Sequence, residues 1–307
     1  MIAFKNVLGV WVFDEKFNLV DKSLFKPEEA LEKLYDETDM QLIKKYNAAT
    51  NLTRDQKRKI LSFFESRAKD FYLPNLMITK KRVKDSIGYD NLIIQTINHV
   101  EELNKISNML SKRLREWYSL YNPEFSNSVD DHLAFSRMIL EGNEPKLKES
   151  MGADLKEDDI VSIKDIATEI VRIDELKERQ ISYLEKIMKK YCPNIQAVAG
   201  TLIGGKLVAM AGSLEKLTIF PSSTVQLLGA EKALFRHIKT GSRPPKFGVI
   251  MNHQLVNSVR LKDKGKVARM LANKISLAAK VDRFKGEFIG DKLAKGLEDA
   301  VKKEGKK

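Results

Sequence analysis

Two long stretches with apolar residues spaced three and four apart constrain the fold of this chain more than any other feature. They cover residues 90–121 and 158–191 of the 307. This spacing puts the apolar side chains on one face of a helix, so each stretch predicts one long helix. Asn122 and Pro123 follow the first stretch, and the residue before a proline disfavours helix, so we expect that helix to end there.

The second stretch resembles a coiled-coil seam with a polar break. Its rhythm is set by four isoleucines, Ile163, Ile166, Ile170 and Ile173. Lys177 and Gln180 interrupt this rhythm, and Leu184 and Ile187 resume it. Short helical pieces over residues 124–156 would join the two long helices into an antiparallel arm. The seam can be satisfied within one chain or by the pairing of two copies.

A third feature is the segment GAEKALFRHIKTGSRPPKFG, residues 229–248. We predict a helix here, capped by Ser223 with Gln226 completing a capping box, and ended by a left-handed Gly241. The helix would carry an apolar face and a cationic face. The apolar residues are Leu234, Phe235 and Ile238, and the cationic residues are Lys232, Arg236 and Lys239.

A stiff basic loop follows this helix. Arg243 and Lys246 flank Pro244 and Pro245, whose φ angles are fixed. A cationic helix end that leads into a rigid cationic loop suits a phosphate backbone. His237, within the helix, could contact RNA, contact a protein or simply pack.

The charge of the chain is concentrated in its C-terminal third. Residues 196–307 hold 22 Lys and Arg against 9 Asp and Glu, a net charge of +13. The first 195 residues hold 32 basic and 33 acidic residues, a net charge of −1. A neutral N-terminal part and a basic C-terminal part predict that one domain binds a polyanion and that the rest of the chain binds protein.

A last strong helix is predicted from Gly265 onward. One face would hold Lys262, Lys266, Arg269, Asn273 and Lys280, if the helix extends back to Lys262. Such a face can be merely solvated, but its single sign of charge and its closeness in sequence to the basic loop favour RNA contact. The end of the chain, KKEGKK, predicts a disordered tail.

The first 83 residues predict a small α/β domain. Residues 6–13, NVLGVWVF, indicate a buried strand, Leu19 and Val20 a second strand, and residues 54–72 an amphipathic helix. Pro27, followed by two glutamates, indicates another helix start. For the large aromatic residues we favour core packing over an exposed docking patch. They are Trp11, Phe13, Phe63 and Phe64.

The segment GAEKALFRHIKTG followed by PPKFG closely resembles the signature of the Nop domain. The resemblance extends upstream through residues 211–217 and 221–226, and downstream through Gly265 to Arg269. The family comprises the archaeal and eukaryotic core scaffolds of box C/D guide ribonucleoproteins and a related spliceosomal protein. Residues 85–290 resemble it in order, and the first 80 or so do so less clearly.

The resemblance implies a mainly α fold with three parts. A small α/β N-terminal domain (1–83) would dock the methyltransferase fibrillarin. A long antiparallel coiled-coil arm (84–193) would form a homodimer. An all-helical C-terminal Nop domain (194–307) would bind a box C/D guide RNA together with its kink-turn-binding protein. The RNA-binding candidates are Lys232, Arg236, His237, Lys239, Arg243, Lys246, Lys262, Lys266, Arg269 and Asn273.

One departure from the family concerns the residues before the last helix. Family members usually carry an aromatic residue and an arginine shortly before the Gly-Lys pair, whereas residues 260–266 here are RLKDKGK. Lysine keeps the charge but lacks the planar fork of arginine. A spliceosomal-type member, which binds a kink-turn ribonucleoprotein without a methyltransferase, is the alternative. The shortness of the C-terminus favours an archaeal-type, cytoplasmic protein; a eukaryotic member would be nucleolar.

We find no sign of an enzyme or a cofactor site. The four histidines do not pair with cysteine or carboxylate at the spacing of a metal site. Cys192 is the one cysteine, so no internal disulfide can form, and we expect its thiol to be inert. Gly200, Gly204 and Gly205 fit no nucleotide-binding motif and predict close helix packing instead. No apolar run is long enough for a membrane span. These patterns favour a scaffold.

Overall fold

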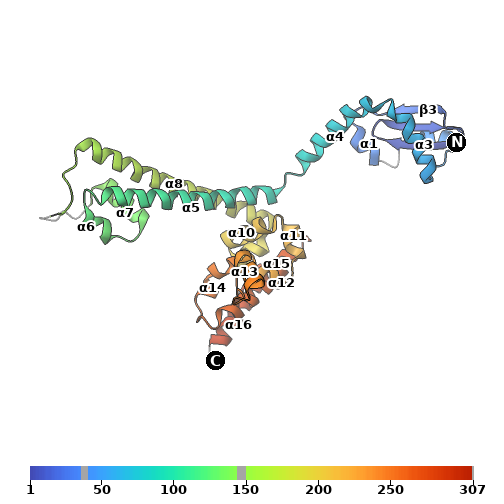
Figure 1. Ribbon diagram of the computed structural model, residues 1–307. Helices are drawn as coiled ribbons and strands as arrows, with labels where there is room; N and C mark the ends of the chain where they lie inside the picture. Colours follow the sequence, from blue (N-terminus) through green and yellow to red (C-terminus); the bar gives the residue numbers. More distant parts are fainter. Residues whose placement is uncertain (36–40, 144–149, 306–307) are drawn as a thin grey trace. The chain divides into compact units, whose positions relative to one another are not determined.

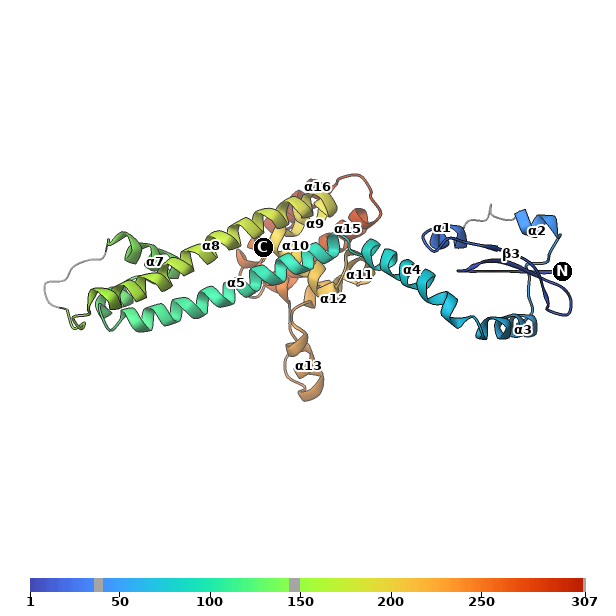
Figure 2. The same cartoon turned by 90° about the horizontal axis from the view of Figure 1, so that it is seen from above.

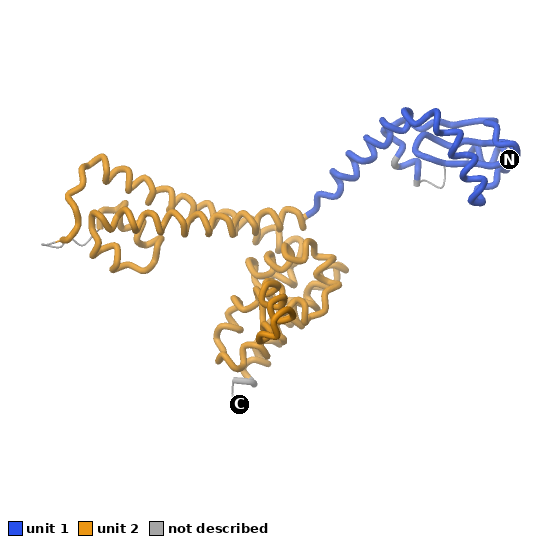
Figure 3. The backbone as a smooth tube through the Cα atoms, viewed as in Figure 1, with its two compact units in different colours: residues 1–88 blue, residues 89–307 orange. Residues whose placement is uncertain are grey.

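The computed structural model describes residues 1–35, 41–143 and 150–305. They form two compact units, Met1–Gly88 and Tyr89–Lys307 (Figure 3). The fold is mainly helical, with one small sheet in the first unit, as predicted.

The first unit is built on a three-stranded antiparallel sheet. Its strands are β1 (Ile2–Asn6), β2 (Gly9–Phe13) and β3 (Leu19–Leu24), in the order β1-β2-β3. The second predicted strand is confirmed, but a single strand over residues 6–13 is wrong. The Asn6 side chain accepts hydrogen bonds from the backbone N–H groups of Leu8 (2.9 Å) and Gly9 (3.3 Å) and so closes a turn between β1 and β2.

An aromatic cluster joins this sheet to the helix that follows. Trp11 and Phe13 are buried in β2, and the Trp11 ring meets the Phe64 ring edge-on with centroids 5.1 Å apart. Core packing of these aromatic residues is therefore confirmed. The helices of this unit are α1 (Ala30–Tyr35), α2 (Gln41–Lys45), α3 (Arg54–Glu65), η1 (Ala68–Phe71) and α4 (Tyr72–Asp85).

The predicted helix over residues 54–72 breaks into α3, η1 and α4. Thr53 begins α3 through a capping box with Gln56. Pro74 lies in the first turn of α4, where its missing N–H costs no hydrogen bond. The helical path is already left at Arg67, whose backbone (φ −108°, ψ 15°) separates α3 from η1.

The arm consists of α5 (Tyr89–Tyr118) and α8 (Glu157–Tyr191) (Figures 1 and 2). The end of α5 packs against the start of α8, where Leu114 and Ile163 share a core, so the two helices are antiparallel. With 35 residues, α8 is about 50 Å long. The prediction that α5 runs to residue 121 is wrong. It ends at Tyr118, and Asn122 instead caps the next helix by accepting a hydrogen bond from Phe125 N–H (3.0 Å).

Two short helices, α6 (Pro123–Ser128) and α7 (His132–Glu141), complete the distal end of the arm. Arg115 holds them in place from α5. Its guanidinium donates to the carbonyl oxygens of Ser126 (2.6 Å), Val129 (2.5 Å) and Asp130 (3.0 Å). The same group lies 4.5 Å from the centre of the Phe135 ring. One arginine thus satisfies the turn between α6 and α7.

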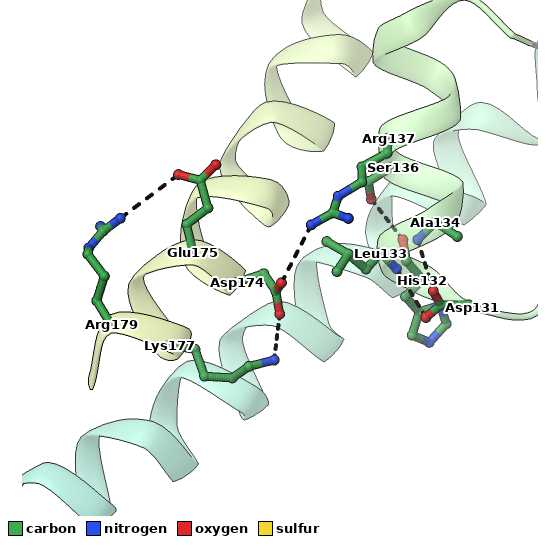
Figure 4. A network of polar contacts seen from close by, with 10 residues as sticks. All are labelled: Asp131, His132, Leu133, Ala134, Ser136, Arg137, Asp174, Glu175, Lys177 and Arg179. Atoms are coloured by element: carbon green, nitrogen blue, oxygen red, sulfur yellow. Dashed lines mark hydrogen bonds and ion pairs between the residues drawn. The ribbon is translucent and has the colours of Figure 1, made fainter. Parts of the chain in front are cut away.

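The predicted polar break in the α8 seam contains a small charged network (Figure 4). Lys177 approaches Asp174 to 2.5 Å, and Arg137 of α7 approaches the same carboxylate to 4.0 Å. At the start of α7, Asp131 accepts hydrogen bonds from Leu133 N–H and Ala134 N–H. Polar groups therefore replace apolar packing here and pair α7 with one position along α8.

The rest of the second unit is a helical domain (Figure 1). The prediction of an all-helical segment is confirmed. The disordered tail predicted from residue 302 is wrong as far as Gly305, because a helix runs through that point and its Leu293, Leu297 and Val301 pack into the core. Its elements are α9 (Pro193–Ala199), α10 (Thr201–Ala211), α11 (Leu214–Ile219), α12 (Ser222–Leu227), α13 (Glu231–Thr240), η2 (Val249–Asn252), α14 (Gln254–Asn257), α15 (Lys264–Arg283) and α16 (Gly290–Gly305).

One apolar core joins the base of the arm to the helical domain. Ile97 of α5 and Met188 of α8 belong to the same buried cluster as residues of α9, α10 and α15. The predicted close packing of small residues is confirmed at Gly204. A Cβ there would lie 2.8 Å from Cε of Met188 and 2.9 Å from Cγ2 of Ile195, so these side chains would have to move. The arm base and the helical domain therefore fold as one body.

A buried carboxylate joins α15 to the start of α9 within this body. Asp282 of α15 accepts hydrogen bonds from the Asn194 backbone (3.0 Å), the Asn194 side chain (2.7 Å) and the Ile195 backbone (2.9 Å) at the start of α9. The Asn194 side chain in turn accepts from Ile289 N–H (2.8 Å). Burial raises the pKa of Asp282, and the three donors oppose that shift. The acid therefore replaces a local N-cap for α9.

We expect Asp282→Ala to lower the free energy of unfolding by about 2–4 kcal/mol, because it leaves buried N–H groups of Asn194 and Ile195 without an acceptor. Urea unfolding at neutral pH measures this loss. The exposed acid Glu287 gives the control, Glu287→Ala, which should unfold like the wild type. An unchanged urea midpoint for Asp282→Ala would contradict the capping role.

Candidate nucleic-acid interface

The segment resembling the signature forms a hairpin, residues 229–247, which we call the α13 hairpin. It projects from the helical domain (Figure 2). The predicted single helix starting at Ser223 is wrong. Two helices form instead, and Leu228, Gly229 and Ala230 separate α12 from α13. Gly229 has a φ of 89°, which ends the helical path.

Gln226 clamps the base of the α13 hairpin and does not form a capping box. Its side chain is buried and donates to the carbonyl oxygen of Lys246 (2.6 Å). Beside it, Gly248 N–H donates to Gln226 O (2.8 Å), and Val249 N–H donates to Leu228 O (2.7 Å). A Cβ on Gly248 would lie 1.9 Å from Leu228 O, so only glycine allows this approach. Polar bonds thus fix both ends of the hairpin.

The cationic face of α13 is exposed. Lys232, Arg236 and Lys239 all face solvent, and none has an acidic partner among the residues that the structure describes. Gly241 ends α13 in the left-handed conformation (φ 68°), as predicted. His237 is half-buried, and its Nδ1 contacts the carbonyl oxygen of Ser242. That contact ties the helix end to the basic loop, where Arg243 is exposed.

The apolar face of α13 is exposed as well. Phe235 is 66% exposed and Ile238 is 73% exposed, and no residue of α13 is buried. The sequence predicted the stripe but not its exposure. Leaving such a side chain in water is unfavourable, since burying it is worth about 1.5–3 kcal/mol. An exposed pair on a projecting helix therefore marks a contact surface.

The exposed face of α15 carries the second group of predicted residues. Lys266, Arg269, Asn273 and Lys280 are all exposed, whereas Val267 and Leu271 on the opposite face are buried. Lys262 does not lie on this face. The helix begins only at Lys264, because residues 261–263 form a turn in which Asp263 N–H donates to Arg260 O (2.9 Å).

The structure brings the hairpin and α15 together at one point. The side chain of Lys246 lies over Gly265, and its Cβ would be 3.7 Å from a Cβ at that glycine. The basic loop therefore runs beside the first turn of α15, next to Lys266. The sequence had suggested that the loop and α15 lie close only because they are near each other along the chain. Their contact joins the cationic surface of the hairpin to that of α15.

Other candidate sites have structural explanations. Burial raises the pKa of Cys192, so its thiol stays protonated and inert. Within the described ranges, no His, Cys, Asp and Glu side chains cluster as a metal site, and no helix has the length and apolar character to cross a membrane.

A cavity of about 920 Å³ lies between the arm base and the helical domain, where Lys206 of α10 pairs with Glu101 of α5.

His253 lies beside that cavity and has both ring nitrogens occupied. Nε2 lies 3.2 Å from the carbonyl oxygen of Val198, and Nδ1 accepts from Leu255 N–H (3.2 Å) at the start of α14. This pattern requires the neutral ring with its proton on Nε2. Burial lowers the pKa of His253. It is therefore a structural cap.

Comparison with known proteins bears on the second unit above all. A family-wide sequence profile described as "Nop: snoRNA binding domain, fibrillarin" matches residues 99–303. That range contains most of the arm, the α13 hairpin and α15.

Three relatives illustrate the similarity. An uncharacterized NOP5 family protein of Methanocaldococcus jannaschii is 38% identical over 247 residues, which cover 73% of this chain and 59% of that protein. Nucleolar protein 56 of Dictyostelium discoideum is 39% identical over 234 residues, covering 67% and 43%. Nucleolar protein 58 of Candida albicans is 38% identical over 239 residues, covering 71% and 46%. The match thus spans about half the length of these curated relatives.

A solved structure, that of a fibrillarin/Nop5p complex, aligns over 98% of this chain and 99% of its own. The TM-score is 0.47 and the sequence identity 21%.

We expect the stability of the protein to fall below pH 6.5 because of His253. The unfolded ring has a pKa of about 6.5, and the folded pKa is lower, so the unfolded state takes up a proton first as the pH falls. The contribution is fully present above pH 6.5 and is lost below it, by at most about 1.4 kcal/mol per pH unit.

Urea unfolding between pH 7.5 and 5 measures this effect. The variant His253→Asn should show a weaker pH dependence than the wild type, whereas His99→Asn, at an exposed position of α5, should keep the wild-type dependence. Equal slopes for wild type and His253→Asn would rule out the capping histidine as their source.

Proposed function

Because the chain belongs to the Nop domain family, we propose that it is a non-catalytic scaffold of a box C/D guide ribonucleoprotein. It binds a kink-turn RNA that already carries its kink-turn-binding protein, and it holds a fibrillarin-type methyltransferase for guided 2′-O-methylation of RNA. The observation that carries this proposal is the two-faced α13, which has no buried residue and stands on a clamped hairpin.

The two faces of α13 suit a composite target. Lys232, Arg236 and Lys239 can neutralise RNA phosphates. Phe235 and Ile238, exposed beside them, can bury apolar surface against the kink-turn-binding protein. Neither face alone would distinguish the complex from bare RNA or from free protein. Arg243, Lys246 and the face of α15 would extend the contact with RNA.

The arm would pair two copies of the chain. Its two helices already satisfy their shared seam, yet large apolar side chains remain exposed on it. They are Ile106, Met109, Leu120, Met151, Val161 and Tyr183. A surface of this kind along the arm supports self-association.

The first unit would hold the methyltransferase. Its aromatic core is self-contained, and α3 and α4 present exposed apolar residues, among them Leu61, Tyr72 and Val83. The chemistry would reside in the partner enzyme. The scaffold would contribute by raising the effective concentration of the target ribose at the active site of that enzyme.

We expect Arg236→Ala combined with Lys239→Ala to weaken binding to a preformed kink-turn ribonucleoprotein about tenfold. The slope of log affinity against log salt should fall by about one per lost phosphate contact. A gel-shift titration of the full chain at several salt concentrations measures both quantities.

The matched control removes two exposed lysines from α16 of the same domain, Lys292→Ala with Lys295→Ala. It should change binding and slope far less. If both double variants behave alike, the cationic face of α13 contacts no RNA. Equal binding of the wild type to bare kink-turn RNA and to the preformed complex would refute composite recognition.

We also expect Phe235→Ser combined with Ile238→Ser to weaken binding to the preformed complex at least tenfold while leaving the salt slope unchanged. These side chains are exposed, so the fold should survive their replacement, and the loss would come from apolar contact. The same titration with bare RNA should show no difference from the wild type.

Leu61→Ser with Val83→Ser, which alters two similarly exposed residues of the first unit, serves as the control. A loss of affinity for bare RNA equal to the loss for the complex would assign the apolar face to RNA instead of protein.

A further inference from the structure

A small hollow opens on the exposed face of α15. It has a volume of about 330 Å³ and lies between α15 and the turn that joins α11 to α12. Residues 218–222 form one side, and Asn273, Ser276, Leu277 and Lys280 form the other. Neither the clamp of the α13 hairpin nor the core of the domain requires this hollow.

The walls of the hollow combine apolar and polar groups. Ile219 is 73% exposed and Leu277 is 45% exposed, although both are large apolar side chains. Asn273 and Ser222 add an amide and a hydroxyl, and Lys280 adds a positive charge at the edge. The structure records no ion pair for Lys280 within the described part of the chain. Apolar contact next to hydrogen-bonding groups and a cation suits a nucleobase better than a purely apolar ligand.

The hollow also continues the cationic face of α15. Arg269 and Asn273 are four residues apart, so they lie one turn from each other on the same side of the helix, about 6 Å along its axis. Lys266 lies one turn further back. Asn273, which lines the hollow, therefore lies about one helical turn beyond the last of these two cations.

We propose that this hollow binds one unstacked base of the RNA that the face of α15 contacts. The proposal rests on the proposed function only in assuming that this face meets RNA. The Asn273 amide donates and accepts along the edge of the base, Leu277 and Ile219 contact its ring, and Lys280 neutralises the adjoining phosphate. An amide that pairs in this way favours adenine.

The test compares two octamers that carry the same phosphates. The full chain is titrated with fluorescein-labelled A8 RNA and with an abasic octamer of equal length, and binding is followed by fluorescence anisotropy. A base-binding hollow makes the wild type prefer A8. Asn273→Ala and Leu277→Ala should each lower the affinity for A8 about fivefold to tenfold and leave the affinity for the abasic octamer unchanged. Both residues are exposed, so neither variant should unfold.

The control Arg269→Ala should weaken binding of both octamers equally and reduce the slope of log affinity against log salt, because it removes a phosphate contact only. Equal affinity of the wild type for the two octamers would overturn the proposal, and so would equal loss for both in Asn273→Ala. Binding to the preformed kink-turn complex, measured with the α13 variants, tests the proposed function separately. If the wild type binds the preformed complex but does not prefer A8, the base site is refuted and the proposed function is not.

Discussion

The apolar core shared by the arm base and the helical domain is the interaction on which the second unit depends. Ile97 and Met188 enter that core from the arm, and Asp282 adds a buried polar pin between α15 and α9. Because this packing is continuous, the arm cannot tilt against the domain without exposing apolar surface. The base of the arm and the helical domain are thereby held in one fixed geometry.

The α13 hairpin has a different source of order. No residue of α13 is buried, and polar bonds at the base of the hairpin, from Gln226 and Gly248, hold its two ends together. The left-handed Gly241 and the contact between His237 and Ser242 stiffen its tip. A hairpin stabilised by polar bonds can leave both the cationic and the apolar face of its helix exposed, which a helix that packs on a core cannot do. This frees both faces of α13 for partners.

The charged and apolar surfaces divide the proposed work of the scaffold. Cations gather on α13, the basic loop and α15, where a polyanion is expected to bind. Exposed apolar side chains occur on the arm, on the first unit and on α13 itself, where protein partners are expected. Charge attracts over a long range but discriminates poorly, whereas apolar contact requires complementary shape. A scaffold that positions an enzyme on an RNA needs both.

The sequence alone determined the elements whose signals are local. The spacing of Ile163 and Ile170, the αL glycine at 241 and the charge of the last third predicted the arm, the end of α13 and the cationic surfaces. Only the tertiary structure decided what depends on distant partners. Gln226 became a clamp because Lys246 lies beside it, and Asp282 caps a helix 88 residues away. Ile219 and Leu277 form a hollow because α11 packs on α15. A periodic pattern indicates which side chains share a face, but only packing against the other elements decides whether that face is buried.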